Sequence, residues 1–189
     1  RNDILDYLFE VERFDRECGQ ILRILEERGE LENTLVIMTS DNGMPFPRSK
    51  ANLYDFGTRM PLAMRWPGQI SPGTVLNGFT NSVDLGPTIL EAASVPIPET
   101  FSGESLWSVL SGAPGRSAVF LERERHANVR SGNLSYPSRA VRDEDFLYIR
   151  NFEPNRWPAG DPSVHQSIGQ YGDVDNSITK FLIMNMEGK

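Results

Sequence analysis

The stretch NTLVIMTSDNGMPFP, residues 33–47, decides the fold class. Its first half is a short run of apolar and β-branched residues without polar alternation, which is the pattern of a strand buried on both faces. An acid, an amide and a glycine follow at once, at Asp41, Asn42 and Gly43. We therefore expect a buried strand that ends just before Asp41, with polar side chains at its carboxyl end.

A helix is predicted immediately before this strand. Apolar residues recur at steps of three, four and seven, which marks one apolar helix face. These residues are Ile4, Leu8, Val11, Cys18, Leu22 and Leu25. Asp15 interrupts the stripe, and Gly29 is the expected stop signal. A helix, a short connection and a buried strand together predict an α/β sheet with parallel strands.

A loop and a second set of elements follow. Residues 44–60 are rich in Pro, Asn and Gly and predict a long loop, after which MPLAMRWPG predicts a strand that ends at Pro67 and Gly68. SVDLGPTILEAASV predicts a helix with Pro87 in its first turn and with Ser82 or Asp84 as its cap. GESLWSVLSG predicts a further short helix, before a Gly/Pro-rich linker at residues 111–115.

The character of the sequence changes beyond this linker. SAVFLERE, SRAVRD and DFLYIRNF are short strand-like runs, and the last two are joined by an acidic turn at Asp143 and Glu144. They predict a small antiparallel sheet. We therefore divide the chain into an α/β core at residues 1–112 and a small antiparallel-sheet subdomain at residues 113–189.

Composition limits the classes of function. The chain has 189 residues and a net charge of −7 without a basic block, which argues against a nucleic-acid surface. The single cysteine excludes an intrachain disulfide framework and multi-cysteine metal motifs. No apolar run approaches the ~20 residues that span a bilayer, so we expect no membrane partner.

The first residues predict a piece of a longer protein. The chain begins RNDILDYLFEVERF, without an initiator Met and already inside a helical pattern. A truncated sheet exposes an edge and apolar faces, which favours self-association into a homo-oligomer.

Asp41 and Asn42 are candidate metal ligands. Ligands of open α/β sheets bind at the carboxyl ends of the strands, where these two residues are expected. A carboxylate beside an amide carbonyl offers hard oxygen atoms, which suit Ca²⁺ or Mg²⁺ better than zinc. The alternative is an ordinary turn, because Asn-Gly is among the commonest turn dipeptides.

Lys50 and Arg59 are candidate anion binders. A lysine contacts a sulfate or phosphate oxygen as a point charge, whereas an arginine prefers a flat, bidentate contact. Both lie in the loop that leaves the strand carrying Asp41. The alternative for each is a solvated surface charge.

These residues, taken in order, resemble the type I sulfatases. NTLVIMTSDNG is followed by Lys50, Tyr54, Gly57 and Arg59, and then by MPLAMRWPG; SVDLGPTILEAASV and SGESLWSVLSG look like the next two landmarks of that family. DNGMPFP, ERERH, YPSRAVR and NFEPNRWPAGDP are most similar to its heparan N-sulfatase (N-sulfoglucosamine sulfohydrolase) branch. The resemblance covers nearly the whole chain, but only the C-terminal part of such an enzyme.

The resemblance implies a fold and an activity. The fold would be the C-terminal part of an alkaline-phosphatase-like α/β sulfatase sheet plus the small antiparallel β subdomain. The activity would be hydrolysis of a sulfate ester or sulfamate on a sulfated saccharide, with N-sulfoglucosamine as the specific expectation. The expected cofactors are Ca²⁺ and a formylglycine nucleophile, and the expected location is periplasmic, secreted or lysosomal.

The resemblance also implies roles for single residues. Asp41 and Asn42 match the pair that completes the family's Ca²⁺ site, and Lys50 matches the catalytic basic residue that binds a sulfate oxygen. His126 is placed where this branch contacts the sugar, and Arg59 is expected to brace the loop.

The family nucleophile is not expected within this chain. SYPSR, residues 135–139, spells the family's C/S-x-P-S-R pentapeptide, but it lies after the metal pair and in a strand-rich region. We predict a structural role for it, so the fragment alone would be inactive. Two alternatives stay open: a phosphoester or phosphonate hydrolase of the same superfamily, and a non-catalytic domain that binds metal or carbohydrate.

Overall fold

The computed structural model describes residues 2–163 and 169–186. Its helices are α1 (Asn2–Glu27), α2 (Asp55–Thr58), α3 (Leu85–Ala92), α4 (Trp107–Leu110) and α5 (Ile178–Met184). Its strands are β1 (Val36–Thr39), β2 (Leu62–Arg65), β3 (Ala118–Arg123), β4 (Ser138–Asp143) and β5 (Leu147–Asn151). Among these described residues, no helix combines the length and apolar character needed to cross a membrane.

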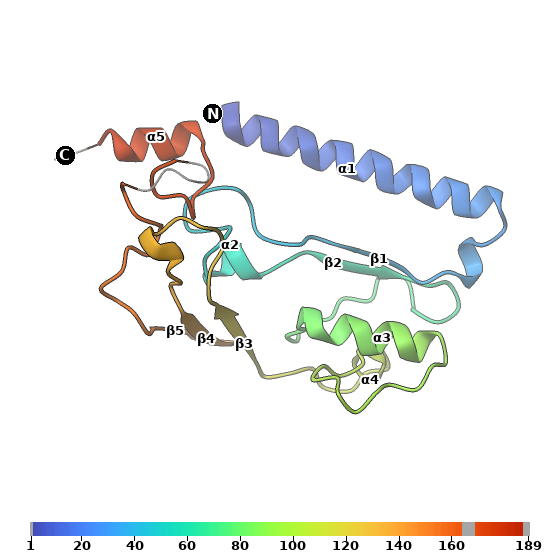
Figure 1. Ribbon diagram of the computed structural model, residues 1–189. Helices are drawn as coiled ribbons and strands as arrows, with labels where there is room; N and C mark the ends of the chain where they lie inside the picture. The colour runs from blue at the N-terminus through green and yellow to red at the C-terminus, as the bar shows by residue number, and fades with distance from the viewer. Residues whose placement is uncertain (1, 164–168, 187–189) are drawn as a thin grey trace.

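α1 has the predicted boundaries, but its apolar face is largely uncovered. The helix ends at Glu27, and Gly29 follows in the left-handed region with φ of +70°. Ile4, Leu8 and Val11 are all exposed. Figure 1 shows α1 as a long rod, with β1 and β2 running between it and α3. The amphipathic pattern therefore predicted the helix correctly. The described residues do not cover most of the apolar face of this helix.

The first strand pair corrects the prediction of parallel strands. β1 and β2 are antiparallel, with Val36 opposite Arg65 and Thr39 opposite Leu62. The connection between them, residues 40–61, is long enough for a crossover, but it holds only the four-residue helix α2, whereas parallel strands are usually joined by a full crossover helix. β1 is also half-buried, and the prediction of burial on both faces is wrong.

Asp84, one of the two predicted caps, is the N-cap residue of α3, although its side chain accepts no hydrogen bond from an N–H group of that helix. Asn81 is the cap residue of a short 3-10 turn, η2 (Ser82–Asp84), that leads into α3. The Asn81 side chain accepts from the main-chain N–H of Val83, and the Asp84 carboxylate accepts from the main-chain N–H of Asn81 at 2.9 Å. Asp84 thus takes part in a reciprocal capping box, as its third residue. Pro87 lies in the first turn of α3, as predicted.

Asp84 also joins the linker to this helix. Its buried carboxylate accepts from the main-chain N–H of Glu104 at 2.9 Å and from Arg116 Nη2 at 2.8 Å. Burial raises the pKa of Asp84, but the hydrogen bonds from Arg116, Glu104 and Asn81 outweigh it, so the pKa lies below its ordinary value. Arg116 also pairs with Phe79 in an isolated β-bridge. The linker is therefore fixed to the α/β part.

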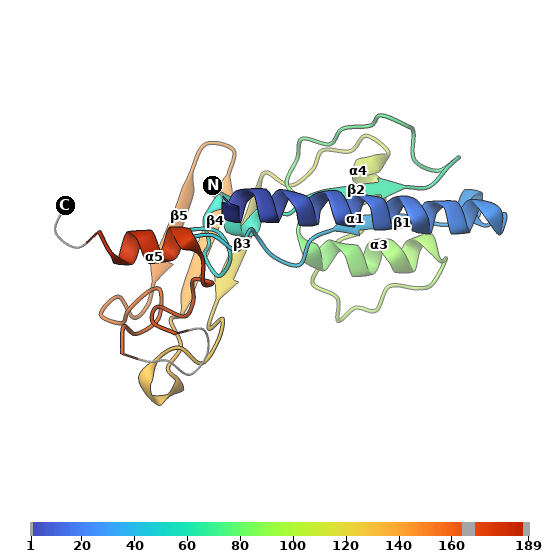
Figure 2. The ribbon, with the colours of Figure 1, turned by 90° about the horizontal axis from the view of Figure 1, so that it is seen from above.

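The second sheet matches the prediction. β3, β4 and β5 form an antiparallel sheet in that order, with Ala140 opposite Leu121 and Ile149. One face is buried at Val119 and Ala140, while Phe120 and Tyr148 on the other face are exposed. Figure 2 shows this sheet beside the α/β part, with α5 close to the N-terminus of α1.

Candidate metal and anion site

The loop after β1 closes on itself. The Ser40 hydroxyl donates to the main-chain oxygen of Asn42 at 2.9 Å. The main-chain N–H of Lys50 donates to the oxygen of Met44 at 3.0 Å, two residues beyond Asn42. The main chain at Lys50 thus returns to Met44, close in sequence to Asp41 and Asn42. Asp41 and Lys50, nine positions apart, therefore belong to one compact loop.

Two glycines make this compact loop feasible. A Cβ built on Gly43 would lie 2.0 Å from the main-chain oxygen of Phe56. A Cβ on Gly57 would lie 2.3 Å from the main-chain oxygens of both Ser49 and Asn52. Real side chains do not tolerate such contacts, so the loop is held by close packing of main chain against main chain.

Asp41 and Asn42 fit part of a calcium site. The Asn42 Nδ2 group donates to Asp41 Oδ1 at 2.6 Å, which leaves Asp41 Oδ2 and Asn42 Oδ1 as hard oxygen donors at the end of β1. Ca²⁺ takes about 6–8 oxygen ligands. No group of three or more His, Cys, Asp or Glu side chains placed to hold a metal occurs within residues 2–163 and 169–186. This pair fits the ion chemically and would supply only part of its shell.

Lys50 makes an ion pair that the sequence did not predict. Its Nζ donates to Asp175 Oδ2 at 2.9 Å, and the two side chains remain 30% and 26% exposed. An ammonium group carries three N–H donors, and the structure assigns one of them to Asp175. Two N–H groups remain to contact an anion. Asp175 comes from the segment just before α5, so the pair joins two distant parts of the chain.

Arg59 does not supply the side-chain brace that was predicted. Its side chain makes no ion pair within the part of the chain that the structure describes, and its main-chain N–H donates to the oxygen of Asp55. The Asp55 carboxylate instead accepts from Arg142 Nε of β4 at 3.1 Å. Asp55 is therefore the residue that ties this loop to the second sheet.

His126 lies at the edge of a buried charged cluster. Its Nδ1 is 3.6 Å from Asp173 Oδ1, and its side chain is 28% exposed. The other carboxylate oxygen of Asp173 accepts from Arg130 Nη2 at 2.6 Å and from Arg123 Nη2. Asp173 and Asp175 are two residues apart, so one short segment contacts His126 at one aspartate and Lys50 at the other.

Sequence reasoning passed over this segment. DVDNSI, residues 173–178, starts like an EF-hand loop but has Ile178 where that motif needs glycine. The sequence signal for a functional segment here was the pair of acids, Asp173 and Asp175, just before Ser177, the N-cap residue of α5. Nothing in the local pattern indicates that Asp173 faces two arginines and Asp175 a lysine.

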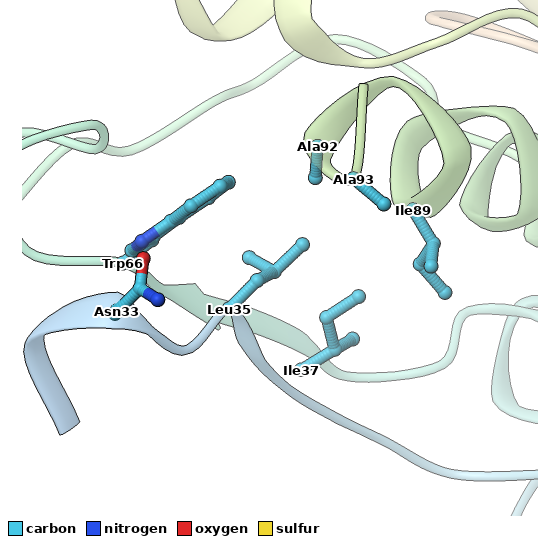
Figure 3. Close-up of a pocket in the computed structure, with 7 residues that line it drawn as sticks. All are labelled: Asn33, Leu35, Ile37, Trp66, Ile89, Ala92 and Ala93. Atoms are coloured by element: carbon cyan, nitrogen blue, oxygen red, sulfur yellow. The ribbon is translucent and has the colours of Figure 1, made fainter. Parts of the chain in front are cut away.

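Two hollows formed by the described residues are each lined by other side chains than the predicted site residues. One, of about 540 Å³, lies between the first strand pair and α3 (Figure 3) and is lined by Asn33, Leu35, Ile37, Trp66, Ile89, Ala92 and Ala93. The other, of about 330 Å³, is lined by Asp3, Asp6, Tyr7, Glu10, Pro45, Phe46, Asn176 and Ser177. Neither lining contains Asp41, Asn42, Lys50 or His126. The candidate site therefore rests on the loop's geometry and side-chain chemistry.

Comparison with known families identifies the first half of the chain. Residues 2–95 match the sulfatase family model, and this match includes β1 and the whole loop that carries Asp41, Asn42 and Lys50. The chain belongs to the sulfatase family. The resemblance recognised from its landmarks is confirmed.

Curated sulfatases extend the match into the second sheet. Human N-sulphoglucosamine sulphohydrolase is 35% identical over 161 residues, which are 80% of this chain and 31% of that protein. N-acetylglucosamine-6-O-sulfatase of Bacteroides thetaiotaomicron is 33% identical over 153 residues, 76% of this chain and 27% of that protein. The chain thus spans about three tenths of the length of these sulfatases.

Solved structures confirm the fold class. A protein in complex with its substrate D-glucosamine-2-N,6-O-disulfate matches with a TM-score of 0.61 and 27% identity, over 77% of this chain and 33% of that one. A second chain, from Bacteroides thetaiotaomicron, has a TM-score of 0.63 at 24% identity and supports the fold alone. The sulfatase α/β class with a small antiparallel sheet is confirmed, while the boundary at residue 112 remains a prediction.

Proposed function

We propose that this chain forms part of a sulfatase, in which it supplies metal ligands and a sulfate-binding lysine. The reaction is hydrolysis of a sulfate ester or sulfamate on a sulfated sugar. The closure of the loop between Ser40 and Lys50 carries this proposal, because it returns the main chain of Lys50 to Met44, two residues beyond the pair of oxygen ligands at the end of β1.

The roles of the three residues follow from charge. Asp41 and Asn42 would hold Ca²⁺, which, when bound, neutralises charge on the sulfate oxygens. Lys50 donates its remaining N–H groups to a sulfate oxygen, where negative charge grows as the bond to the leaving group breaks. Such preplaced electrostatic contacts are each worth about 10²–10³ in rate.

The nucleophile in this proposal lies outside the chain, as does the rest of the metal shell. Within SYPSR, Ser138 is buried and its hydroxyl donates to Asn151 Oδ1 at 2.9 Å in the second sheet. Arg139 pairs with Glu124 at 2.6 Å. Tyr136 is buried as well. These contacts fit the structural role predicted for this pentapeptide. Ser135, which occupies the position of the family nucleophile, is half-buried, and its main-chain oxygen accepts from Arg156 Nη1 at 2.9 Å.

The proposed substrate is a sulfated glucosamine, with N-sulfoglucosamine as the specific candidate. The human relative at 35% identity is an N-sulphoglucosamine sulphohydrolase, and the structural neighbour at 27% identity holds a glucosamine disulfate. His126 is the proposed sugar contact, because its ring is partly exposed and lies 3.6 Å from Asp173 at the edge of the buried charged cluster.

The proposal is tested by comparing matched leaving groups on sulfur and phosphorus. The protein, expressed with its native flanking sequence and with added Ca²⁺, is assayed on an aryl sulfate and on the corresponding aryl phosphate. We expect the larger kcat/KM on the sulfate. A larger kcat/KM on the phosphate would assign the site to a phosphoester hydrolase of the same superfamily, and no hydrolysis of either ester would contradict an enzymatic role.

A further inference from the structure

The segment before α5 presents a carboxylate to Lys50. Asp175 Oδ2 accepts from Lys50 Nζ at 2.9 Å across 125 positions of sequence. Both side chains are about three-quarters buried. The ion pair is therefore partly buried, neither fully exposed to solvent nor fully excluded from it. An anion can still approach the ammonium group of Lys50.

One side of this segment is fixed by the buried cluster of the second sheet. The main-chain N–H of Asp173 donates to the oxygen of Ala159 at 3.0 Å. The Asp173 side chain is fully buried and is bonded by Arg130 at 2.6 Å and by Arg123. Because two arginines hold this carboxylate, the chain just before Asp175 has little freedom to move.

The other side is fixed by a buried lysine of α5. Lys180 Nζ donates to the main-chain oxygen of Val174 at 2.8 Å and to Asn176 Oδ1 at 3.1 Å, so it holds both sequence neighbours of Asp175. The Ser177 hydroxyl accepts from the main-chain N–H of Lys180 at 3.0 Å and caps the helix. Asp175 is thus held between two anchored neighbours, with its carboxylate directed at Lys50.

We propose that Asp175 is a positioning residue that holds the Lys50 ammonium ready for the sulfate group. A lysine has a flexible four-carbon stem, and ordering it only when the substrate arrives costs entropy. An ion pair formed beforehand fixes one N–H and leaves two directed away from Asp175. This inference rests on the function proposed for Lys50. It makes Asp175, from the second half of the chain, part of the sulfate-binding site.

A purely structural ion pair makes a different prediction. If the pair only tied the loop to α5, loss of Asp175 would lower stability, as loss of Lys50 would, and would leave kcat unchanged. If Asp175 acts through Lys50, its effect on turnover disappears once Lys50 has been replaced. The coupling between the two substitutions therefore separates the two roles.

The experiment is a double-mutant cycle in the protein with its native flanking sequence. Wild type, Lys50→Ala, Asp175→Ala and the double variant are assayed on an aryl sulfate for kcat and KM. We expect Asp175→Ala alone to lower kcat by about tenfold, since a misplaced group costs up to ~10²-fold. KM should stay unchanged or fall, because the carboxylate no longer competes with the sulfate for the ammonium group. In the Lys50→Ala background, Asp175→Ala should change neither constant.

Two further variants complete the design. Asp175→Glu keeps the carboxylate and should recover part of the lost kcat. Glu124→Ala removes another long-range carboxylate, the partner of Arg139 at 2.6 Å, and should leave kcat unchanged. Urea midpoints of all variants report stability separately. A tenfold loss of kcat from Asp175→Ala that persists in the Lys50→Ala background would overturn the positioning role.

Failure of the proposed function is distinguishable. If wild type does not hydrolyse the aryl sulfate, the same cycle is measured by calorimetry with inorganic sulfate. A change in sulfate affinity from Asp175→Ala only when Lys50 is present would support the positioning role and reject the sulfatase activity. Wild type that neither hydrolyses the ester nor binds sulfate would overturn both proposals.

Discussion

Replacement of Asp84 by alanine should cost about 3 kcal/mol of unfolding free energy. The Asp84 carboxylate is 1% exposed and accepts from the N–H groups of Asn81 and Glu104 and from two nitrogens of Arg116. Breaking a buried ion pair by removing one partner costs about 3–5 kcal/mol. The Arg116 side chain is one-third exposed, so water can solvate it after the substitution, and the lower end of that range applies.

Chemical denaturation measures this loss, and Glu104→Ala is the matched control. The Glu104 carboxylate also approaches Arg116, at 3.5 Å, but it is 79% exposed. Exposed pairs contribute about 0–1 kcal/mol, so the control should change the unfolding free energy by less than that. Asp84→Ala and Glu104→Ala that shift the urea midpoint equally would refute the reasoning from burial.

The pH dependence gives a second check on the same carboxylate. Since the pKa of Asp84 is lowered in the folded state, its stabilising contribution is fully present above the unfolded pKa of about 3.9 and is lost as pH falls through the folded pKa. The stability difference between wild type and Asp84→Ala should stay constant between pH 7 and 5 and shrink below about pH 4. A difference that vanished near pH 6 would contradict this assignment.

Two further predictions concern the loop and its metal. Gly57→Ala should destabilise the protein by about 1–3 kcal/mol and lower sulfatase activity, because the new Cβ would meet two main-chain oxygens. Gly19→Ala on the open face of α1 is the control and should stabilise the protein by up to about 1 kcal/mol. Thermal unfolding compares the two variants, and equal shifts of their melting temperatures would contradict the packing argument. Removal of metal with EDTA should lower activity by at least about tenfold, and Ca²⁺ should restore it; unchanged turnover after dialysis against EDTA would contradict a metal role for Asp41 and Asn42.

Local patterns predicted the elements of this fold better than their partners. The helix that stops at Gly29 and the three strands of the second sheet follow from apolar periodicity and turn residues, which act over a few positions. The direction of β2 relative to β1 does not, because an apolar run marks a strand and leaves both its burial and the direction of its partner to the rest of the fold. The antiparallel pairing depends on how the loop after Thr39 folds back.

The candidate site shows the same division. Asp41, Asn42 and Lys50 could be proposed from the sequence because they lie within one loop and match a family motif in order. Asp175 was missed because its contact with Lys50 spans 125 positions. Asp173 was dismissed as a failed metal motif, since its importance depends on burial between two arginines. Long-range burial and pairing are properties of the folded chain.

The turnover of Lys50→Ala on a sulfate ester tests the central claim most directly. The control is Arg48→Ala, which removes a cation from the same loop whose guanidinium stacks 4.5 Å from the ring centre of Tyr54. We expect Lys50→Ala to lower kcat by about 10²–10³-fold and Arg48→Ala by less than about threefold. Wild-type turnover in Lys50→Ala, or equal losses in the two variants, would contradict the assignment of Lys50 to the sulfate.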